Sequence, residues 1–192
     1  MQLYGVFGRP RSLVFAVLAI WSSAAAAATL PTGKKAITLV AADGMRLDIG
    51  HVTFAGDQAG AAIAVVLDAP QFTDEFLSMR PFRCIAGTKE SWCHLPYPYQ
   101  TKAHVTPDDL TDLEYALLFL FKPPAGYGID AWNGLYFQLA LAPDGSIGGA
   151  LHEVDLNILA VPPMAGNLRP IARAALTPVA ADSHRFARIE IR

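Results

Sequence analysis

Hydrophobic and polar side chains alternate along much of the chain, and the pattern is clear in residues 45–49. There, apolar residues occupy every second position around two charged ones, a spacing that is typical of a half-buried strand. A second β-rich run spans residues 37–40, and Asp43-Gly44 lies between the two runs. Because Asp-Gly between β-rich runs is a strong hairpin signal, the sequence predicts a β-hairpin here.

Further segments of strand length follow the same logic. The clearest hairpin pairs residues 135–142 with residues 147–156 across a Pro-Asp-Gly-Ser turn. Residues 60–67 form an Ala/Val/Ile run, and residues 185–191 alternate as a closing strand. The pattern predicts about seven to nine strands and little helix. The expected fold is therefore mainly β: an antiparallel β-sandwich or small β-barrel with one or two short helical turns.

The helical turns come from less clear segments. Residues 106–109 read Thr-Pro-Asp-Asp, a helix start with an N-cap, a proline at the first position and acids in the first turn. The run that follows fits both helical and strand spacing, and its aromatic residues favour one helical turn and then a buried strand over about 112–121. A second short helical turn is predicted at residues 73–75. Residues 160–181 predict an extended loop with one helical turn near Ile171.

Both cysteines, Cys84 and Cys93, lie in one segment, residues 76–99. Between them is a polar stretch with a glycine, flanked by β-compatible runs, which predicts a hairpin. With a two-residue turn at Thr88-Lys89, the cysteines face each other as a non-hydrogen-bonded pair, where side chains lie closest. That geometry suits a disulfide, and closing a loop of about ten residues should contribute about 2.5–3 kcal/mol.

The first 28 residues have the three parts of a secretory signal peptide. Arg9 and Arg11 form a basic start, residues 13–21 are apolar, and small residues precede a cleavage point after Ala28. The alternative is an uncleaved anchor, but the apolar core is shorter than the roughly 20 residues that a span needs. We therefore expect a periplasmic or secreted protein with no stable membrane span after cleavage, in which the cysteines oxidise.

Residues 29–192 are long enough for one domain with a core of its own. The sequence thus predicts a signal peptide over residues 1–28 and a single β-rich domain stapled by the Cys84–Cys93 disulfide. Two of the 15 basic residues lie in residues 1–28, and none of the 17 acidic residues does. Residues 29–192 therefore have 13 basic and 17 acidic residues, a net charge of −4. The basic residues are scattered, which excludes the electrostatic footprint of a nucleic-acid-binding protein.

Four short runs stand out in the middle of the chain: M-R-P-F-R-C at 79–84, W-C-H-L-P-Y-P-Y at 92–99, D-L-T-D-L-E-Y at 109–115 and W-N-G-L-Y at 132–136. Together they resemble a family of small exported bacterial proteins of unknown function, over roughly residues 75–137. The resemblance implies export. It carries no activity, substrate or catalytic residue to this chain.

Aromatic residues with polar tips gather in the same region. All five tyrosines and both tryptophans of residues 29–192 lie between positions 92 and 136, and such side chains suit half-wet binding surfaces. Two arginines nearby, Arg80 and Arg83, can clamp an anionic group. We therefore predict that one surface concavity is bordered by four residues: Arg80, Trp92, His94 and Tyr97.

The alternative is that these rings form the core and that the arginines pair with Asp112 or Glu114. The sequence has no nucleophile elbow, zinc-protease motif or phosphate-binding loop, and oxidised cysteines supply no thiol nucleophile. A metal site or a hydrolase would have to combine residues whose spacing has no ligand pattern: His94, His104, His152, Glu153 and Asp155. We predict no catalytic residue, metal or cofactor.

The sequence therefore predicts an exported, non-catalytic binding module or envelope accessory protein. Its expected partner is a small molecule, a glycan or an envelope protein, and no nucleic acid. The second possibility is a small hydrolase or lyase acting on an envelope or extracellular substrate. A cleft that brings the histidines and acids together would favour the enzyme, whereas an aromatic groove without converging acid–base groups would favour the binding module.

Overall fold

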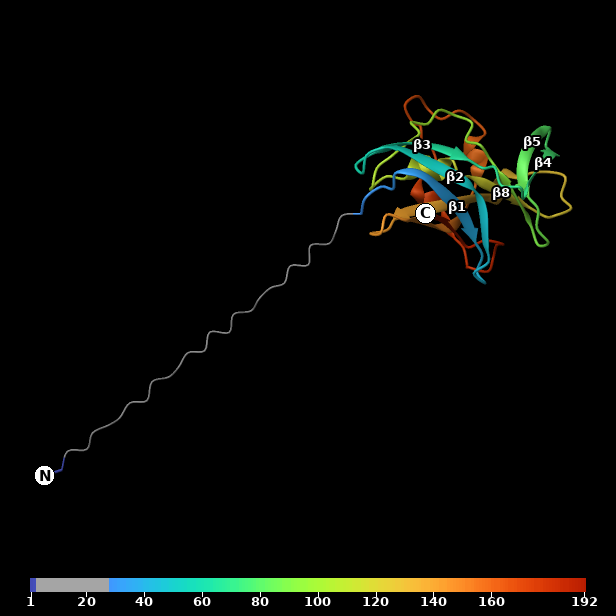
Figure 1. Cartoon of the computed structure of the whole chain (residues 1–192). Coiled ribbons are helices and arrows are strands. Elements are labelled where there is room, and N and C mark those ends of the chain that lie inside the picture. The colour runs from blue at the N-terminus through green and yellow to red at the C-terminus, as the bar shows by residue number, and fades with distance from the viewer. Residues whose placement is uncertain (3–27) are drawn as a thin grey trace.

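A computed structural model describes residues 1–2 and 28–192 of the chain. Its strands form one antiparallel sheet of 12 strands, in the order β4-β5-β6-β8-β9-β10-β12-β1-β2-β3-β7, with β11 paired to β10 (Figure 1). Only a few short helical turns accompany the sheet. The predicted fold class, mainly β and antiparallel, is confirmed, and within the described residues the sheet stays open rather than closing on itself.

The strands have the following bounds: β1 Gly33–Val40, β2 Arg46–Gly56, β3 Ala61–Val66, β4 Phe72–Leu77, β5 Arg80–Ile85, β6 Ser91–His94, β7 His104–Val105, β8 Phe119–Lys122, β9 Gly134–Leu141, β10 Ile147–Val154, β11 Thr177–Pro178 and β12 Arg188–Ile191. The helical elements are α1 Thr111–Tyr115 and three 3₁₀ turns, η1 Ala131–Asn133, η2 Leu156–Leu159 and η3 Arg173–Ala175. The turn η3 lies next to Ile171, where the sequence predicted a helical turn.

One face of the sheet forms the main core, and this requires the sheet to coil. Trp92 of β6 and Phe186, just before β12, are separated by three strands in the sheet order, yet their rings are 5.2 Å apart. Neighbouring strands are about 4.8 Å apart, so a flat sheet would hold these rings several times further apart. Same-face residues such as Ile37 and Phe137 belong to the same buried cluster.

The opposite face of β8 and β9 carries a second buried cluster. Leu120 and Tyr136 extend from these strands into it, and Leu156, Leu159 and Ile171 cover them from the segment between β10 and β11. The two sides of the sheet in this region are therefore both buried, which explains why the strands read as apolar runs rather than as a clean alternation.

The two predicted hairpins lie where the turn residues place them. Strands β1 and β2 pair across the turn at residues 41–45, with Val40 opposite Arg46. Strands β9 and β10 pair across residues 142–146, with Leu141 opposite Ile147. In the second turn Gly145 has φ of +80°, a conformation that glycine adopts without a steric penalty.

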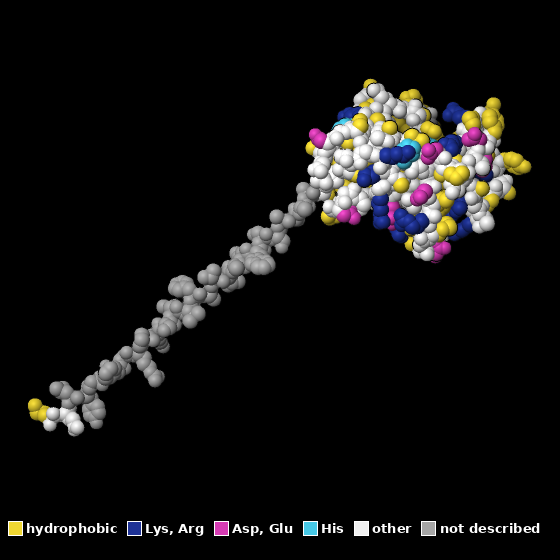
Figure 2. Space-filling view, viewed as in Figure 1, with side chains coloured by type: hydrophobic (Ala, Val, Ile, Leu, Met, Phe, Trp, Pro, Cys, Tyr) yellow, Lys and Arg dark blue, Asp and Glu magenta, His cyan; other side chains and the backbone are white. Residues whose placement is uncertain are grey.

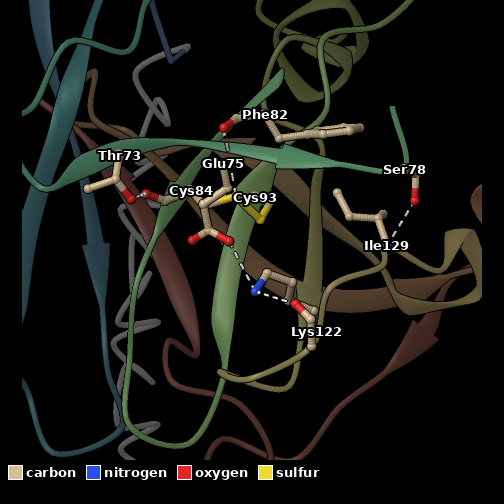
Figure 3. Close-up of a disulfide and its surroundings, with 9 residues drawn as sticks. Thr73, Glu75, Ser78, Phe82, Cys84, Cys93, Lys122 and Ile129 are labelled. Atoms are coloured by element: carbon tan, nitrogen blue, oxygen red, sulfur yellow. Dashed lines mark hydrogen bonds and ion pairs between the residues drawn. A yellow bond between two sulfur atoms is a disulfide. The ribbon is translucent and has the colours of Figure 1, made fainter. Parts of the chain in front are cut away.

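The disulfide lies at the centre of the β5–β6 pair, as predicted. Cys84 is directly opposite Cys93, with Cα atoms 4.0 Å apart, and both are fully buried. An ion pair on the same side joins Lys122 of β8 to Glu75 of the edge strand β4, at 3.0 Å (Figure 3). The disulfide and the ion pair together fasten the β4–β5 hairpin, which projects from one end of the molecule (Figure 1), to the rest of the sheet.

Two predictions of local structure are wrong. Residues 73–75 form part of strand β4, because each residue there pairs with β5, which a short peptide window cannot reveal. The helix begins at Thr111 rather than at residues 106–109, since Thr106 and Asp109 bond to each other's backbone in a closed turn. The strand predicted over 112–121 accordingly starts only at Phe119.

The predicted signal peptide, residues 1–28, lies almost wholly outside the described residues. The structure therefore leaves this prediction as it stands. In the part of the chain that is described, helices are all too short to span a bilayer.

Candidate functional site

Two cavities lie on either side of the segment at residues 95–99, which follows β6. The first, which we call the polar cavity, has a volume of about 420 Å³ and includes Arg83, His94, Tyr97 and Asp112 in its lining. The second, the apolar cavity, has a volume of about 630 Å³ and includes Arg80. Both contain Pro96, so this segment forms a shared wall.

The four residues predicted to border one concavity are therefore divided. His94 and Tyr97 line the polar cavity, and Arg80 lines the apolar cavity. Trp92 lines neither, because it is fully buried in the main core, where its Nε1 donates to Glu90 Oε1 at 2.7 Å. The prediction that Trp92 borders a binding surface is thus corrected.

Strand geometry explains this division. Side chains on a strand alternate between the two faces of the sheet. On β5, Arg83 and Ile85 share the inner face, and Ile85 belongs to the main core, whereas Arg80 and Cys84 lie on the outer face. The inner-face Arg83, which the sequence offered with Arg80 as a clamp for an anionic group but did not place at the concavity, is the arginine that accompanies His94.

The polar cavity lies at the gap where the sheet stays open. One wall comes from β3, where the inner-face residues Ile63 and Val65 line it, and the other comes from β5 and β6. Arg83 of β5 spans the gap, because its Nη1 donates to the carbonyl oxygen of Leu67, directly after β3. The guanidinium also lies over the ring of Phe72, 5.0 Å from its centre. Arg83 is thus held in place within the lining.

His94 is a neutral imidazole with a fixed orientation. Burial lowers its pKa below the ordinary value, the nearby charge of Arg83 adds to this effect, and a hydrogen bond with Ala116 opposes it. That bond joins His94 Nε2 to the carbonyl oxygen of Ala116 at 3.1 Å. Because a carbonyl oxygen only accepts, Nε2 carries the proton and Nδ1 carries the lone pair. His94 can therefore offer a hydrogen-bond acceptor to a ligand.

The two tyrosines of the lining contribute their rings rather than their hydroxyl groups. Tyr97 donates its hydroxyl hydrogen to the carbonyl of Leu168 at 2.9 Å, and Tyr99 donates to the carbonyl of Leu159 at 2.7 Å. Their rings meet edge to face, 5.6 Å apart. Burial, and to a lesser degree Tyr99 and Asp112, raise the pKa of Tyr97. The tyrosines therefore present neutral aromatic surface to the cavity.

The one acid in the lining, Asp112, is already ion-paired. Its Oδ1 accepts a hydrogen bond from Arg169 Nε at 2.7 Å, and its Oδ2 accepts one from the backbone N–H of His104. The same arginine bonds Asp109 at 2.5 Å. Burial acts to raise the pKa of Asp109, but the bonds from Arg169 and Thr111 outweigh it and lower the pKa to about 2. Arg83 is the permanent cation of the lining.

These ion pairs also answer the alternative in which Arg80 and Arg83 pair with Asp112 or Glu114. Asp112 pairs with Arg169, and Glu114 pairs with Arg173 at 2.8 Å. Both partners come from the segment at residues 169–173, which the sequence assigned only to a long loop. Nothing in the local spacing indicated that this loop would return to α1, so the sequence could not identify these pairs.

The residues that an enzyme would need do not converge. Of the five candidates, only His94 lines the polar cavity. His104 lies on β7, and Glu153 bonds His184 at 3.0 Å. His152 Nδ1 lies 3.2 Å from the carbonyl of Ala150, and Asp155 caps the turn η2. Across the residues that the structure describes, no group of three His, Cys, Asp or Glu side chains is placed to hold a metal ion. The geometry of the cavity suits binding better than acid–base chemistry.

Comparisons with known proteins give no further assignment. No family model matches the chain, and neither a curated protein nor a solved structure is similar to it. The resemblance to small exported bacterial proteins therefore stays an expectation from the four sequence runs.

Proposed function

We propose that the protein is an exported, non-catalytic binding module and that its polar cavity takes a small organic anion. The observation that carries this proposal is the placement of Arg83 at the open gap of the sheet, beside neutral His94 and within an aromatic lining. The leader-like residues 1–28 and the Cys84–Cys93 disulfide support export.

The chemistry of the ligand follows from the lining. Arg83 uses Nη1 for Leu67, which leaves further N–H donors in the fork geometry that matches a carboxylate. Apolar surface in the same lining comes from Ile63, Val65 and the tyrosine rings. A volume of about 420 Å³ lies in the usual range for small-molecule sites. Among the expected partners, a small molecule fits this cavity better than a glycan chain or a protein.

The test uses oxidised protein comprising residues 29–192 and a panel of small carboxylates, each paired with its neutral amide. Binding is detected by thermal shift and measured by calorimetry. We expect at least one carboxylate to bind and its amide to bind at least about tenfold more weakly, because a hydrogen bond to a charged group contributes about 1.5–3 kcal/mol.

Substitutions of Arg83 test whether the ligand binds in the polar cavity. Arg83→Gln should weaken carboxylate binding by about tenfold or more, whereas Arg83→Lys should retain part of it, since the charge stays and the fork is lost. Lys102→Ala is the matched control, because it removes an exposed positive charge next to the lining residues Thr101 and Ala103 but is not itself part of the lining. If the carboxylates and amides bind equally, or if Lys102→Ala and Arg83→Gln have the same effect, the proposal is wrong.

A further inference from the structure

The apolar cavity is a separate site with its own chemistry. Its floor is formed by large apolar side chains from several elements: Phe82, Leu95, Leu120, Ile129, Leu156 and Leu159. Three of these, Leu120, Leu156 and Leu159, are at most 7% exposed. This lining comes from the second hydrophobic cluster, on the outer face of the sheet, whereas the polar cavity opens on the inner face. The two cavities can therefore be tested independently.

A single cation marks the lining of the apolar cavity. Every described residue that lines it is neutral except Arg80, which is exposed to solvent and forms no ion pair among the described residues. Two acids, Asp130 and Asp155, are next to lining residues in the sequence, and each accepts a hydrogen bond within its own turn. Asp130 accepts from the backbone N–H of Trp132 at 3.0 Å, and Asp155 accepts from that of Asn157 at 2.9 Å. The charge of Arg80 is thus available to an anionic group.

Exposed hydrophobic side chains are next to lining residues in the sequence. Four such side chains each follow or precede a lining residue: Met79 (87% exposed), Trp132 (68%), Ile158 (42%) and Val161 (66%). Figure 2 shows hydrophobic side chains standing out at the β4–β5 end of the molecule. Exposed apolar side chains gathered on one part of a surface are typical of an interaction site for an apolar ligand.

The hairpin that carries Arg80 has an unusual backbone. Ser78 and Met79, at the turn between β4 and β5, have φ of +48° and +66°, a region that residues other than glycine and asparagine rarely adopt. The turn is held by a hydrogen bond from the backbone N–H of Ile129 to Ser78 Oγ, at 3.3 Å (Figure 3). Ile129 and Ser78 both line the cavity, so this contact fixes Arg80 relative to the apolar floor.

We propose that the apolar cavity binds the acyl chain of a fatty carboxylate and that Arg80 binds its carboxylate group. An apolar cavity of about 630 Å³ with one cation and no acid in its lining complements a long apolar chain with one negative charge. One guanidinium balances the single charge of a carboxylate and can bond both of its oxygens. This site is independent of the small-anion site proposed for the polar cavity.

Three probes test separately how the apolar chain and the negative charge of the ligand contribute to binding. Dodecanoate, octanoate and dodecyltrimethylammonium are titrated into oxidised protein comprising residues 29–192, below their aggregation concentrations, with calorimetry as the readout. We expect dodecanoate to bind at one site per chain and octanoate to bind more weakly by about fourfold per missing methylene. Dodecyltrimethylammonium, with the same chain and the opposite charge, should bind at least about tenfold more weakly than dodecanoate.

Two pairs of variants test the assignment of residues. Arg80→Ala should weaken dodecanoate binding by about tenfold or more, whereas the exposed Lys102→Ala should leave it unchanged. Ala160→Phe places a ring in the cavity and should abolish binding. Its matched control, Ala175→Phe, adds the same ring at an exposed position of another 3₁₀ turn and should bind as the parent does.

Three outcomes would overturn the proposal. Equal binding of dodecanoate and dodecyltrimethylammonium would show that Arg80 does not select the charge. Binding that never saturates at one ligand per chain would indicate adsorption to the exposed hydrophobic side chains. Loss of dodecanoate binding in Arg83→Gln but not in Arg80→Ala would place the chain in the polar cavity instead. If Ala160→Phe fails to fold, the comparison of Arg80→Ala with Lys102→Ala still tests the proposal.

Discussion

The substitution Glu90→Gln should remove a pH-dependent part of the folding stability. Glu90 is 6% exposed, and its Oε1 accepts hydrogen bonds from Trp92 Nε1 and the backbone N–H of Arg185, both at 2.7 Å. Its Oε2 lies 3.1 Å from Nδ1 of His184, whose Nε2 lies 3.0 Å from Glu153. A glutamine with its carbonyl oxygen at the Oε1 position keeps the first two bonds and turns its NH₂ group towards His184.

The sign of the effect follows from the two pKa shifts. Burial lowers the pKa of His184, but the bonds to Glu90 and Glu153 outweigh it and raise the pKa above its ordinary 6.5. Protonated His184 therefore stabilises the fold fully below pH 6.5, and this stabilisation is lost as the pH rises through the raised value. Burial raises the pKa of Glu90, but its bonds lower it below 4.5 overall, so its contribution is present above pH 4.5 and is lost as the pH falls.

The magnitude is that of one hydrogen bond between charged groups. In Glu90→Gln, the NH₂ group faces Nδ1, and two donors cannot bond, so His184 must give up its proton. We expect the variant to be about 1.5–3 kcal/mol less stable than the parent at about pH 5.5. Above the raised pKa of His184, where the imidazole is neutral in both proteins, the difference should shrink to about 1 kcal/mol, because the retained bonds now have a neutral acceptor.

Urea unfolding at several pH values between about 5 and 8 measures the effect. His94 titrates in the same range with the opposite sign, since its lowered pKa makes the fold less stable as the pH falls below 6.5. That contribution is common to parent and variant and cancels in their difference. His184→Gln is the second control and should show the same flattened pH dependence. If Glu90→Gln keeps the parent's pH dependence, the His184–Glu90 pair does not stabilise the fold in this way.

Three further predictions concern other parts of the chain. Replacing Cys84 and Cys93 together by serine should lower the free energy of unfolding by about 2–4 kcal/mol, and non-reducing mass spectrometry of the parent should find one disulfide and no free thiol. N-terminal sequencing of protein from the cell envelope should begin near Thr29; recovery of intact Met1 in the membrane fraction would refute cleavage. Burial and the adjacent Glu114 raise the pKa of Tyr136, so Glu114→Gln should lower the pH at which the Tyr136 phenol ionises in an ultraviolet titration.

The sequence predicted the local part of the fold well, because hairpins are specified by residues that are close together. The Asp-Gly turns and the Cys84–Cys93 register depend on a few neighbouring residues. The errors come from segments that are decided at long range. Residues 73–75 became a strand through pairing with β5. Residues 112–115, predicted as the start of a strand, belong to the helix α1, where arginines from a distant loop bond Asp112 and Glu114.

The coiling of the sheet was also beyond local reasoning. Alternation shows that a strand has an inner face, but not which distant strand that face meets. Trp92 illustrates the difference, since its neighbours Phe137 and Phe186 come from β9 and the approach to β12. The walls that β3 and the segment after β10 contribute to the two cavities are set by the same long-range packing.

One part of the site, however, follows from the register alone. With Cys84 opposite Cys93, strand alternation places Arg83 and His94 on the inner face and Arg80 on the outer face. Trp92 shares the inner face with His94, but it lies two pairs further along the strand, opposite Phe121 and against Phe119, and it is buried. His94 is the last residue of its strand and reaches the open gap. The same alternation that separates the two arginines therefore gives the molecule two cavities of different character, each with one cation free to meet an anionic ligand.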